Sequence, residues 1–229
     1  MISVIIPVLA EAASINNMIA HLVIQASEER IEIIVVDGDL DRSTSRVMHL
    51  GAALCIASER GRALQMNRGA QVACGHLLLF LHADTLLPEK AFSLIRLAMN
   101  EERIVAGAFT LGFNSNRKIF RITEIYARVR TWLTRVPFGD QAIFIRREYF
   151  ERIGGFKEVP LMEDVDLMKR IRRRGDKIVI LPEKVLTSSR RYEQEGIIYC
   201  TLRNLVLQFL YMFGVSPGWL AKWYRPHNS

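Results

Sequence analysis

Cysteine is scarce in this chain: three occur among 229 residues, and they lie far apart. Cys55, Cys74 and Cys200 make neither an even set nor a Cys-x-x-Cys pair, which argues against a disulfide scaffold and against a structural zinc module. Chains without a disulfide framework are typical of a reducing compartment. We therefore expect a cytoplasmic protein, associated at most with the inner face of a membrane.

Long hydrophobic runs are missing as well. The apolar N-terminal stretch lacks a basic segment and is interrupted by Pro7 and Glu11, so it predicts a buried strand rather than a signal peptide. The longest apolar stretch, residues 197–215, is broken by an arginine, an asparagine and a glutamine. That composition makes it a poor candidate for a transmembrane helix.

Linkers rich in glycine, serine or proline are absent, and there is no internal repeat. Hydrophobic residues make up 50% of the chain, enough to fill the core of one α/β domain of this length but not comfortably of two. We expect one domain over residues 1–195, followed by an amphipathic helix and tail over 196–229. That helix packs on the core, forms a dimer or lies in a membrane interface, and core packing is the default interpretation.

Acidic residues are in deficit, and the deficit lies in one half of the chain. Residues 1–116 contain 9 basic and 12 acidic side chains, whereas residues 117–229 contain 22 and 12, and the net charge is +7. This asymmetry predicts different partners, such as a metal ion for the first half and an anionic molecule or surface for the second. The basic run at 169–174 has no interleaved aromatic residues, so we do not expect nucleic-acid binding.

What the first half does contain is an alternation of short apolar runs with helical patterns. The runs lack polar alternation, as in strands covered on both faces: Ile2–Pro7, Ile31–Val36, Ala53–Ala57 and Leu77–Leu81. The helical patterns between them cover Ile15–Ala26, with Ser14 as N-cap, then Thr44–Leu50 and Ala63–Ala73. This order predicts an α/β fold with a Rossmann-like, doubly wound, mostly parallel sheet.

The second half contains further helices and strands. The patterns predict helices over residues 90–100, 117–134, 147–153, 163–174 and 197–213. They predict strands over residues 141–146, 177–181 and 185–188, and a stretch of alternating character covers 106–113. One domain with an appended C-terminal helix accommodates all of these elements.

Two aspartates follow apolar runs, at the strand ends where ligands of open α/β sheets bind. Asp37 is equally consistent with a hydrogen bond to a nucleobase or ribose and with a cap on the following turn. Asp84 suits Mg²⁺ or Mn²⁺, which accept one or two protein carboxylates and take their other ligands from phosphates and water; a capping role is the alternative. His82 lies on the same strand face and is a second candidate ligand, although a structural histidine is the commoner case.

Arginine pairs mark two further candidate anion sites. Arg60 and Arg62 flank a glycine at the start of a predicted helix, where backbone amides and the helix dipole also favour a diphosphate. A solvated helix start is the alternative. Arg190 and Arg191 follow the last predicted strand and either reach an anionic leaving group or lie in solvent.

The densest acidic cluster follows Pro160, where Glu163, Asp164 and Asp166 fall within four positions. Acidic side chains at a helix N-terminus stabilise the helix dipole, which is the simpler interpretation. Three crowded carboxylates also repel one another, and such repulsion is one way to raise the pKa of a general base.

Six segments, in chain order, resemble those of bacterial family 2 glycosyltransferases: SVIIPVLAE, IIVVDG, GRALQMNRGA, LLLFLHADTLLP, GDQAIFIRR and LMEDVDLMKRIRRRG. The likeness covers nearly the whole chain and is strongest to a small soluble branch with HADT where many members carry DxD. It implies a GT-A fold, with the nucleotide-sugar site in residues 1–116 and the acceptor site and base in 117–195. It also implies an inverting, metal-assisted transfer from a nucleoside-diphosphate sugar to an acceptor hydroxyl.

The resemblance further implies which residues bind the donor. They match the family motifs at these positions: Pro7, Glu11, Asp37, Arg60, Arg62, Asn67, Asp84, Arg190 and Arg191. Asp84 would hold Mg²⁺ or Mn²⁺ with the diphosphate, and His82 is the further candidate ligand.

On the acceptor side, the resemblance makes Asp164, with Glu163 beside it, the catalytic base. Asp140 and Gln141 would face the acceptor. The excess of arginine in this half suits a phosphorylated or lipid-linked acceptor, or a membrane surface.

The chain departs from the family pattern around the donor. Ala10 stands where members usually have Asn, and Leu40 and Arg42 replace small residues where the backbone would approach the nucleotide. A non-catalytic nucleotide-sugar or membrane-surface binding module is therefore the alternative function. A nucleotidyltransferase is the second alternative, but it would normally have a glycine-rich phosphate loop where this chain has Pro-Val-Leu-Ala after its first strand.

Overall fold

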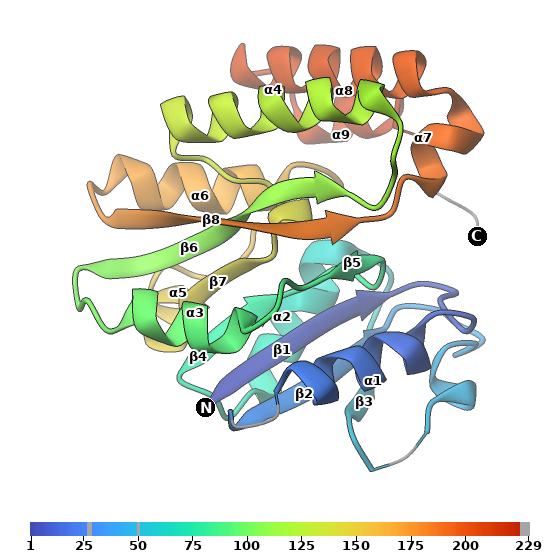
Figure 1. Ribbon diagram of the computed structural model, residues 1–229, viewed down its shortest axis with the longest axis vertical. Coiled ribbons are helices and arrows are strands. Elements are labelled where there is room, and N and C mark those ends of the chain that lie inside the picture. The colour runs from blue at the N-terminus through green and yellow to red at the C-terminus, as the bar shows by residue number, and fades with distance from the viewer. Residues whose placement is uncertain (27–28, 50, 225–229) are drawn as a thin grey trace.

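The computed structural model describes residues 1–26, 29–49 and 51–224, which form helical layers on both faces of one sheet (Figure 1). Over these residues the sheet has eight strands in the order β3-β2-β1-β4-β7-β6-β8-β5. In chain order they are β1 (Ile2–Val8), β2 (Ile31–Asp37), β3 (Leu54–Ala57), β4 (Leu77–Phe80), β5 (Thr85–Leu86), β6 (Ile104–Phe113), β7 (Ile143–Arg146) and β8 (Lys177–Thr187).

The helices of this part of the chain are α1 (Ile15–Gln25), α2 (Arg62–Val72), α3 (Ala91–Met99), α4 (Lys118–Thr134), α5 (Arg147–Arg152), α6 (Glu163–Arg173), α7 (Arg190–Glu195), α8 (Ile197–Met212) and α9 (Pro217–Ala221). Helices α1 and α3 pack on one face of the sheet, and α2, α5 and α6 pack on the other. Helix α4 packs on the end of β6, and α8 and α9 pack on the loop before α6. In Figure 1, α4 and α8 lie together at the top of the molecule.

The alternating pattern of the first half forms the parallel sheet that it predicts. β1 pairs in parallel with β2 and β4, and β2 pairs in parallel with β3. Beyond β4 the sheet is mixed: β7 is antiparallel to β4 and β6, β8 is parallel to β6, and β5 is antiparallel to β8. The carboxyl ends of β1, β2 and β4 therefore meet at one edge, which is where ligands of such sheets bind.

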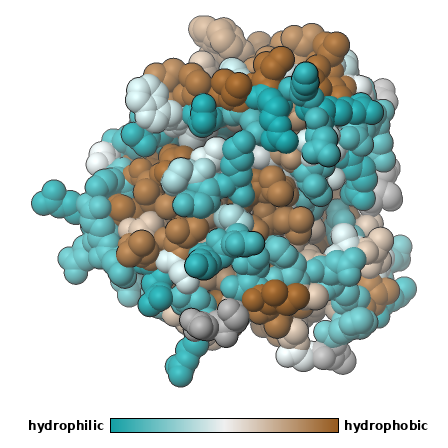
Figure 2. Space-filling model, viewed as in Figure 1, coloured by the Kyte–Doolittle hydropathy of each residue, from teal (hydrophilic) through white to brown (hydrophobic). Residues whose placement is uncertain are grey.

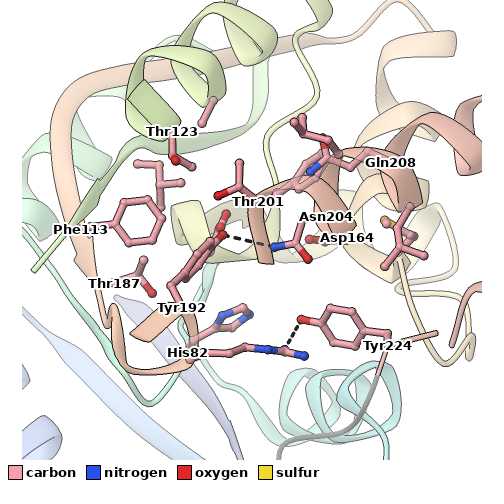
Figure 3. Close-up of a pocket in the computed structure, with 18 of the residues that line it drawn as sticks. His82, Phe113, Thr123, Asp164, Thr187, Tyr192, Thr201, Asn204, Gln208 and Tyr224 are labelled. Atoms are coloured by element: carbon pink, nitrogen blue, oxygen red, sulfur yellow. Dashed lines mark hydrogen bonds between the residues drawn. The ribbon is translucent and has the colours of Figure 1, made fainter. Parts of the chain in front are cut away.

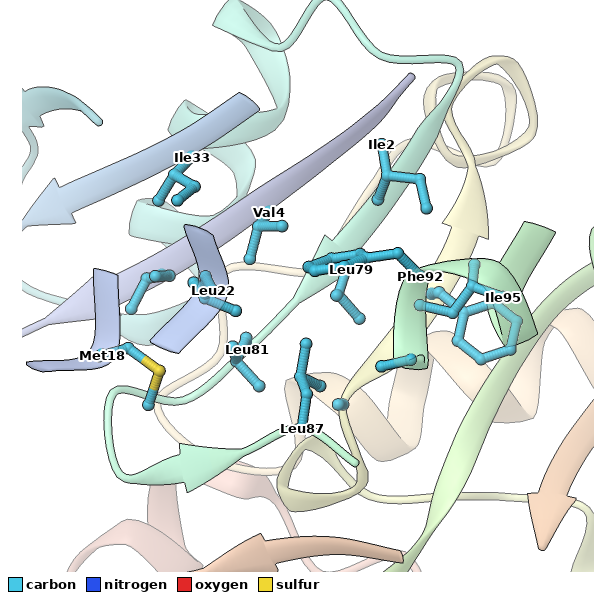
Figure 4. Close-up of a cluster of buried hydrophobic side chains, with 14 of the residues drawn as sticks. Ile2, Val4, Met18, Leu22, Ile33, Leu79, Leu81, Leu87, Phe92 and Ile95 are labelled. Atoms are coloured by element: carbon cyan, nitrogen blue, oxygen red, sulfur yellow. The ribbon is translucent and has the colours of Figure 1, made fainter. Parts of the chain in front are cut away.

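Strand side chains alternate between two hydrophobic cores, one on each face of the sheet. In β4, Leu77 and Leu79 point to the core under α1 and α3, whereas Leu78 and Phe80 point to the core under α2, α5 and α6. Figure 4 shows the first core, where Leu79 lies beside Phe92 of α3. Because both faces are covered, these strands are encoded by continuous apolar runs.

The prediction of a helix over Thr44–Leu50 is wrong for the part of this segment that the structure describes. Only a 3₁₀ turn at Ser45–Val47 forms, and Leu50 lies outside the described residues. The preceding loop is held by a side chain instead, because the backbone amide of Ser45 donates to Asp37 Oδ2 at 3.0 Å. Side-chain acceptors of this kind compete with the hydrogen bonds of a helix.

The two strands predicted over 177–181 and 185–188 form one strand, β8. Its pairing with β6 shifts register between Phe109 and Thr110, so that Pro182 and its neighbour are left out of the ladder. Proline has no amide hydrogen to donate, and a bulge lets the strand continue past it. The short elements β5, α7 and α9 were not predicted, whereas the other predicted elements form within two residues of their expected ends.

We expected the C-terminal helix, α8, to pack on the core, and only one edge of it does so. Cys200 and Leu207 are the buried residues of α8, while much of the rest of the helix is exposed. No helix within the described ranges is both long and apolar enough to cross a membrane. The part of the predicted tail beyond Tyr224 lies outside the described residues.

Gly107 is required by the close packing of β6 on its neighbours. A Cβ added there would lie 2.4 Å from Phe144 Cζ and 2.6 Å from Val179 Cγ1. We expect Gly107→Ala to lower the free energy of unfolding by about 1–3 kcal/mol, because overpacking displaces both side chains. Chemical denaturation monitored by circular dichroism measures this loss.

The matched control is Gly218→Ala in α9, where an added Cβ meets nothing within 4 Å. Alanine is a better helix former than glycine, so this variant should be at least as stable as the wild type. Equal midpoints for the two variants would contradict the packing described for β6.

Candidate active site

Two hollows meet at the carboxyl edge of the sheet, and Asp84 lines both of them. The first hollow, of about 230 Å³, lies between α2, α4, α6, α7 and α8 (Figure 3). The second, of about 320 Å³, lies between the β1–α1 loop and the start of α7, with Glu11 and Arg190 among its lining residues. We call them the α4–α8 hollow and the β1–α7 hollow.

The position of Asp84 is fixed by the pairing of β5 with β8. The backbone amide of Ser188 donates to the carbonyl oxygen of Asp84 at 3.1 Å, and Thr85 Oγ1 donates to Thr187 Oγ1 at 3.2 Å. The main chain around Asp84 is thereby anchored, while its side chain is exposed. An anchored but accessible carboxylate is available to a ligand in either hollow.

Asp164 stands in the first turn of α6 and lines the α4–α8 hollow. The backbone amide of Gly139 donates to its Oδ2, and the amide of Val165 donates to its Oδ1 at 2.7 Å. These bonds orient the carboxylate and satisfy one of the free amides of the helix N-terminus. Each carboxylate oxygen has a second lone pair, so Asp164 can still accept a proton from a bound hydroxyl.

Glu163 is buried, with 2% of its surface exposed, and it lies against Arg62 at the start of α2. Its Oε1 is 3.6 Å from Arg62 Nη1. Burial raises the pKa of Glu163, the guanidinium of Arg62 opposes the rise, and the neighbouring Asp164 adds to it. The pair places a cation beside Asp164 in the α4–α8 hollow, so the structure brings these three predicted residues together.

Asp140 also faces the α4–α8 hollow, from the 3₁₀ turn that follows α4. Its Oδ1 is buried and accepts no hydrogen bond from the residues that the structure describes. Burial raises the pKa of Asp140 to about 6; Arg130 opposes the shift, and the charges of Asp164 and Asp84 reinforce it. Its neighbour Gln141 does not face the hollow, because its amide is buried and donates to the carbonyl of Phe109 at 2.9 Å.

His82 lines the α4–α8 hollow two residues before Asp84. Burial and the nearby charge of Arg62 lower the pKa of His82 to about 3, which favours the neutral imidazole, in which one ring nitrogen carries no proton. Among the described residues, no group of three or more histidine, cysteine or acidic side chains is arranged to hold a metal. Asp84 and His82 therefore fit a cation that takes its remaining ligands from a diphosphate and water, but not an all-protein metal site.

In the β1–α7 hollow, Glu11 and Arg190 face each other with 4.0 Å between Oε1 and Nη2. Glu11 is held in place by Ser14, whose Oγ donates to Glu11 Oε2 at 2.8 Å. The predicted N-cap residue thus fixes a side chain of the hollow, and its own side chain makes no capping bond to α1. Arg191 points to the α4–α8 hollow instead, where its guanidinium stacks on the ring of Tyr224 at 4.0 Å.

Four other predicted donor residues line neither hollow. Pro7 lies within β1 opposite Val36, and Arg60 is exposed before α2. Asp37 is buried, and its two carboxylate oxygens accept bonds from backbone amides of the loop 39–45, which is the capping role of the two considered. Asn67 bonds the backbone of Phe156 through both ends of its amide, at 2.9 Å each.

Helices α4 and α8 supply residues of the site that the sequence did not single out. Arg130 stacks on the Phe138 ring at 3.5 Å and donates to Gln208 Oε1 at 3.4 Å. Asn204 donates to the hydroxyl of Tyr192 at 3.2 Å, as Figure 3 shows. The signal for α8 was present in the sequence, because polar residues at positions 201, 204 and 208 form one stripe on a helix that is apolar elsewhere except at Arg203.

Comparison with known proteins assigns the chain to a family. The sequence profile described as Glycosyl transferase family 2 matches residues 3–157, which is more than half of the chain. None of the curated protein sequences compared with the chain matches it.

Solved structures share the fold. A mannosyltransferase from Pyrobaculum calidifontis, in complex with GDP-Man and Mn²⁺, is 22% identical with a TM-score of 0.65; the alignment covers 81% of this chain and 56% of that protein. Glucosyl-3-phosphoglycerate synthase from Mycobacterium tuberculosis, in complex with Mn²⁺, UDP and phosphoglyceric acid, is 20% identical with a TM-score of 0.63, and the coverages are 94% and 79%. This chain thus spans just over half the length of the first protein and most of the second.

The structural likeness confirms the predicted α/β fold of the GT-A type, with a mixed, mostly parallel sheet and C-terminal helices. The profile match extends from β1 through α5, and so includes Asp37 at the end of β2 and Asp84 in the turn before β5. The chain belongs to glycosyl transferase family 2 and is a glycosyltransferase.

Proposed function

We propose that this glycosyltransferase moves a sugar from a nucleoside diphosphate to an acceptor hydroxyl with inversion at the anomeric carbon. The observation that carries the proposal is the exposed carboxylate of Asp84 at the junction of two hollows, one of which also contains Asp164. A donor held at Asp84 has its sugar next to a base that is fixed at the start of α6. Reactants positioned in this way lose little further entropy on reaction.

The donor is proposed to bind along the β1–α7 hollow, with its diphosphate at Asp84. A divalent cation, Mg²⁺ or Mn²⁺, held by Asp84 with His82 as a second ligand, would neutralise the charge that develops on the diphosphate. Arg190 lies in the same hollow and Arg62 and Arg191 line the other, so cations surround the leaving group on both sides. The Mn²⁺ present in the two solved relatives supports this assignment.

In the transfer step, Asp164 is proposed to act as the general base. The acceptor oxygen forms a bond to the anomeric carbon while the bond from that carbon to the diphosphate oxygen breaks. The hydroxyl proton passes to Asp164, and the electron pair of the broken bond stays on the nucleoside diphosphate. Glu163 acts indirectly, because its contact with Arg62 holds that cation beside the reacting atoms.

The acceptor is proposed to be a hydroxyl compound that carries a phosphate, either free or linked to a lipid. Arg130 and Arg191 line the α4–α8 hollow, and the buried Nε of Arg130 donates to no acceptor among the described residues. The synthase relative was solved with phosphoglyceric acid, which is a free acceptor of this class. Transfer assays with free sugar phosphates and with polyprenyl phosphates separate the two sources.

Replacement of Asp164 by Asn should lower the transfer rate by about 10²- to 10⁴-fold, because the amide cannot accept the proton. Donor affinity should stay within about twofold of the wild type, since Asp164 is proposed to contact the acceptor rather than the nucleotide. Release of nucleoside diphosphate measures the rate, and titration calorimetry measures donor binding.

Asp166→Asn is the control for this change. Asp166 lies in the same turn of α6, but its carboxylate pairs with Lys157 and Arg170 rather than lining either hollow. It should keep a transfer rate close to the wild-type value. Wild-type transfer by Asp164→Asn would exclude Asp164 as the base.

Replacement of Asp84 by Ala should raise the donor Kd at least tenfold in the presence of Mn²⁺ and should abolish the effect of Mn²⁺ on donor binding. A calorimetric panel of GDP- and UDP-linked sugars, titrated with and without Mn²⁺, identifies the donor and tests this expectation. Glu102→Ala, at an exposed carboxylate before β6, should leave the affinity unchanged. Donor that binds without any transfer or hydrolysis would instead favour a non-catalytic module.

The raised pKa of Asp140 predicts that folding depends on pH. The carboxyl has a usual pKa of 3.8 and a pKa of about 6 in the folded protein, so the folded state holds its proton more tightly. The stability that this proton provides is complete below pH 4 and is lost as the pH rises through about 6. Asp140→Asn should therefore become more stable than the wild type over that range, by up to about 3 kcal/mol.

Denaturation of both proteins between pH 4 and pH 8, in buffer with a chelator, measures this difference. A gap in stability that stays constant with pH would contradict the assignment of the raised pKa to Asp140.

A further inference from the structure

An unusually large set of apolar side chains is exposed on the outer sides of α4 and α8. On α4, Ile122, Ile125, Val129 and Trp132 are 47–70% exposed, and their spacing of three or four residues places them on one face. On α8 and at its C-cap, Phe213, a second set is 55–75% exposed, again with helical spacing: Leu202, Val206, Phe209 and Phe213. We call these two sets together the apolar face.

The two helices present the apolar face on one side of the molecule. Tyr126 of α4 donates to Gln208 of α8 at 3.4 Å, and Arg130 of α4 donates to the same side chain. Figure 2 shows brown side chains gathered along the top, where Figure 1 places α4 and α8. Scattered apolar residues are normal on protein surfaces, whereas a contiguous patch of this kind marks an interaction site.

Charge borders the apolar face, and it is of one sign. Arg121 and Arg128 are seven residues apart and therefore lie along one side of α4, and Arg135 follows directly after the end of the helix. The only acidic residue in segments 118–134 and 197–224 is Glu124, which is buried and paired with Arg121 and Lys184. Within segments 118–134 and 197–224, the face and its border thus combine apolar, aromatic and basic groups without exposed negative charge.

This combination of apolar and basic groups favours one kind of partner for the apolar face. A second copy of the chain related by a twofold axis would bring the same basic border against itself, with no acidic groups in these helices to compensate. A bilayer that contains anionic lipids supplies both an apolar interior for the exposed side chains and phosphate groups for the arginines. Tryptophan and tyrosine, represented here by Trp132 and Tyr199, are enriched at such interfaces.

We propose that the apolar face docks the protein on the surface of an anionic lipid bilayer, with α4 and α8 lying in the plane of the interface. Docking of this kind needs no membrane-spanning helix. It needs neither donor nor metal, so it is independent of the proposed reaction.

The test is flotation of the full-length protein with vesicles of phosphatidylcholine alone or with one third phosphatidylglycerol. The wild type should float with the anionic vesicles at low salt, and at least tenfold less should float with neutral vesicles. The double variant Trp132→Ser/Phe209→Ser should reduce flotation with anionic vesicles at least tenfold. Both side chains are exposed by more than 60%, so the fold should tolerate the change.

Matched controls lie elsewhere on the surface. Ile24→Ser/Leu97→Ser changes two apolar residues of α1 and α3 that are more than 70% exposed, and it should float like the wild type. Arg128→Glu should weaken flotation, whereas Arg103→Glu, at an exposed site before β6, should weaken it much less.

Wild-type protein that stays at the bottom of the gradient with both kinds of vesicle would overturn the proposal. Equal flotation of Trp132→Ser/Phe209→Ser and the wild type would overturn it too. Sedimentation velocity tests for a dimer. If the protein is a dimer that dissociates in Trp132→Ser/Phe209→Ser but persists in Ile24→Ser/Leu97→Ser, the apolar face serves self-association and the proposal is overturned.

Discussion

The site depends on the pairing of β5 with β8, which involves only two residues of each strand. This short antiparallel ladder ties the end of the N-terminal half of the chain to the end of the longest strand of the sheet, β8. It fixes the backbone of Asp84 and also sets where the chain turns into α7, the helix that carries Arg190 and Arg191. Both hollows share this junction, so a donor and an acceptor bound on either side of it would meet at one carboxylate.

Around this junction, negatively and positively charged side chains are interspersed. Carboxylates of Asp84, Asp140 and Asp164 come from three different segments, and cations from α2, α4 and α7 stand among them. The charge of the sequence is uneven, negative in residues 1–116 and positive in 117–229, yet both halves contribute both signs to the site: Arg62 and Asp84 come from the first, and Arg130 and Asp140 from the second. Much of the positive excess lies outside the hollows, however, on the outer surfaces of α4 and α6.

Local sequence patterns predicted the strands, the parallel half of the sheet and the residues at its carboxyl edge. They did so because apolar runs, strand ends and helix starts are encoded within a few residues, as at Asp84 after β4 and at Asp164 in the first turn of α6. Patterns could not show that the side-chain amides of Asn67 and Gln141 bond to backbone far along the chain, since that depends on tertiary contacts. For Asp37 they left the local cap and the ligand contact equally open. Nor could they place Arg130 in the site, because it lines the hollow only through the packing of α4 on β6.

Helices α4 and α8 each have an inner and an outer side with different contacts, and this difference explains the unusual composition of both helices. Their inner sides place Arg130 and Asn204 in the α4–α8 hollow, and their outer sides carry the apolar face. A helix that only covered a core would need neither the polar stripe nor the exposed aromatic residues. If the outer sides rest on a bilayer, the hollow between the inner sides lies close to the lipid headgroups. A phosphate-bearing acceptor anchored in that bilayer would then reach Asp164 without leaving the membrane, whereas a free acceptor would gain nothing from the docking.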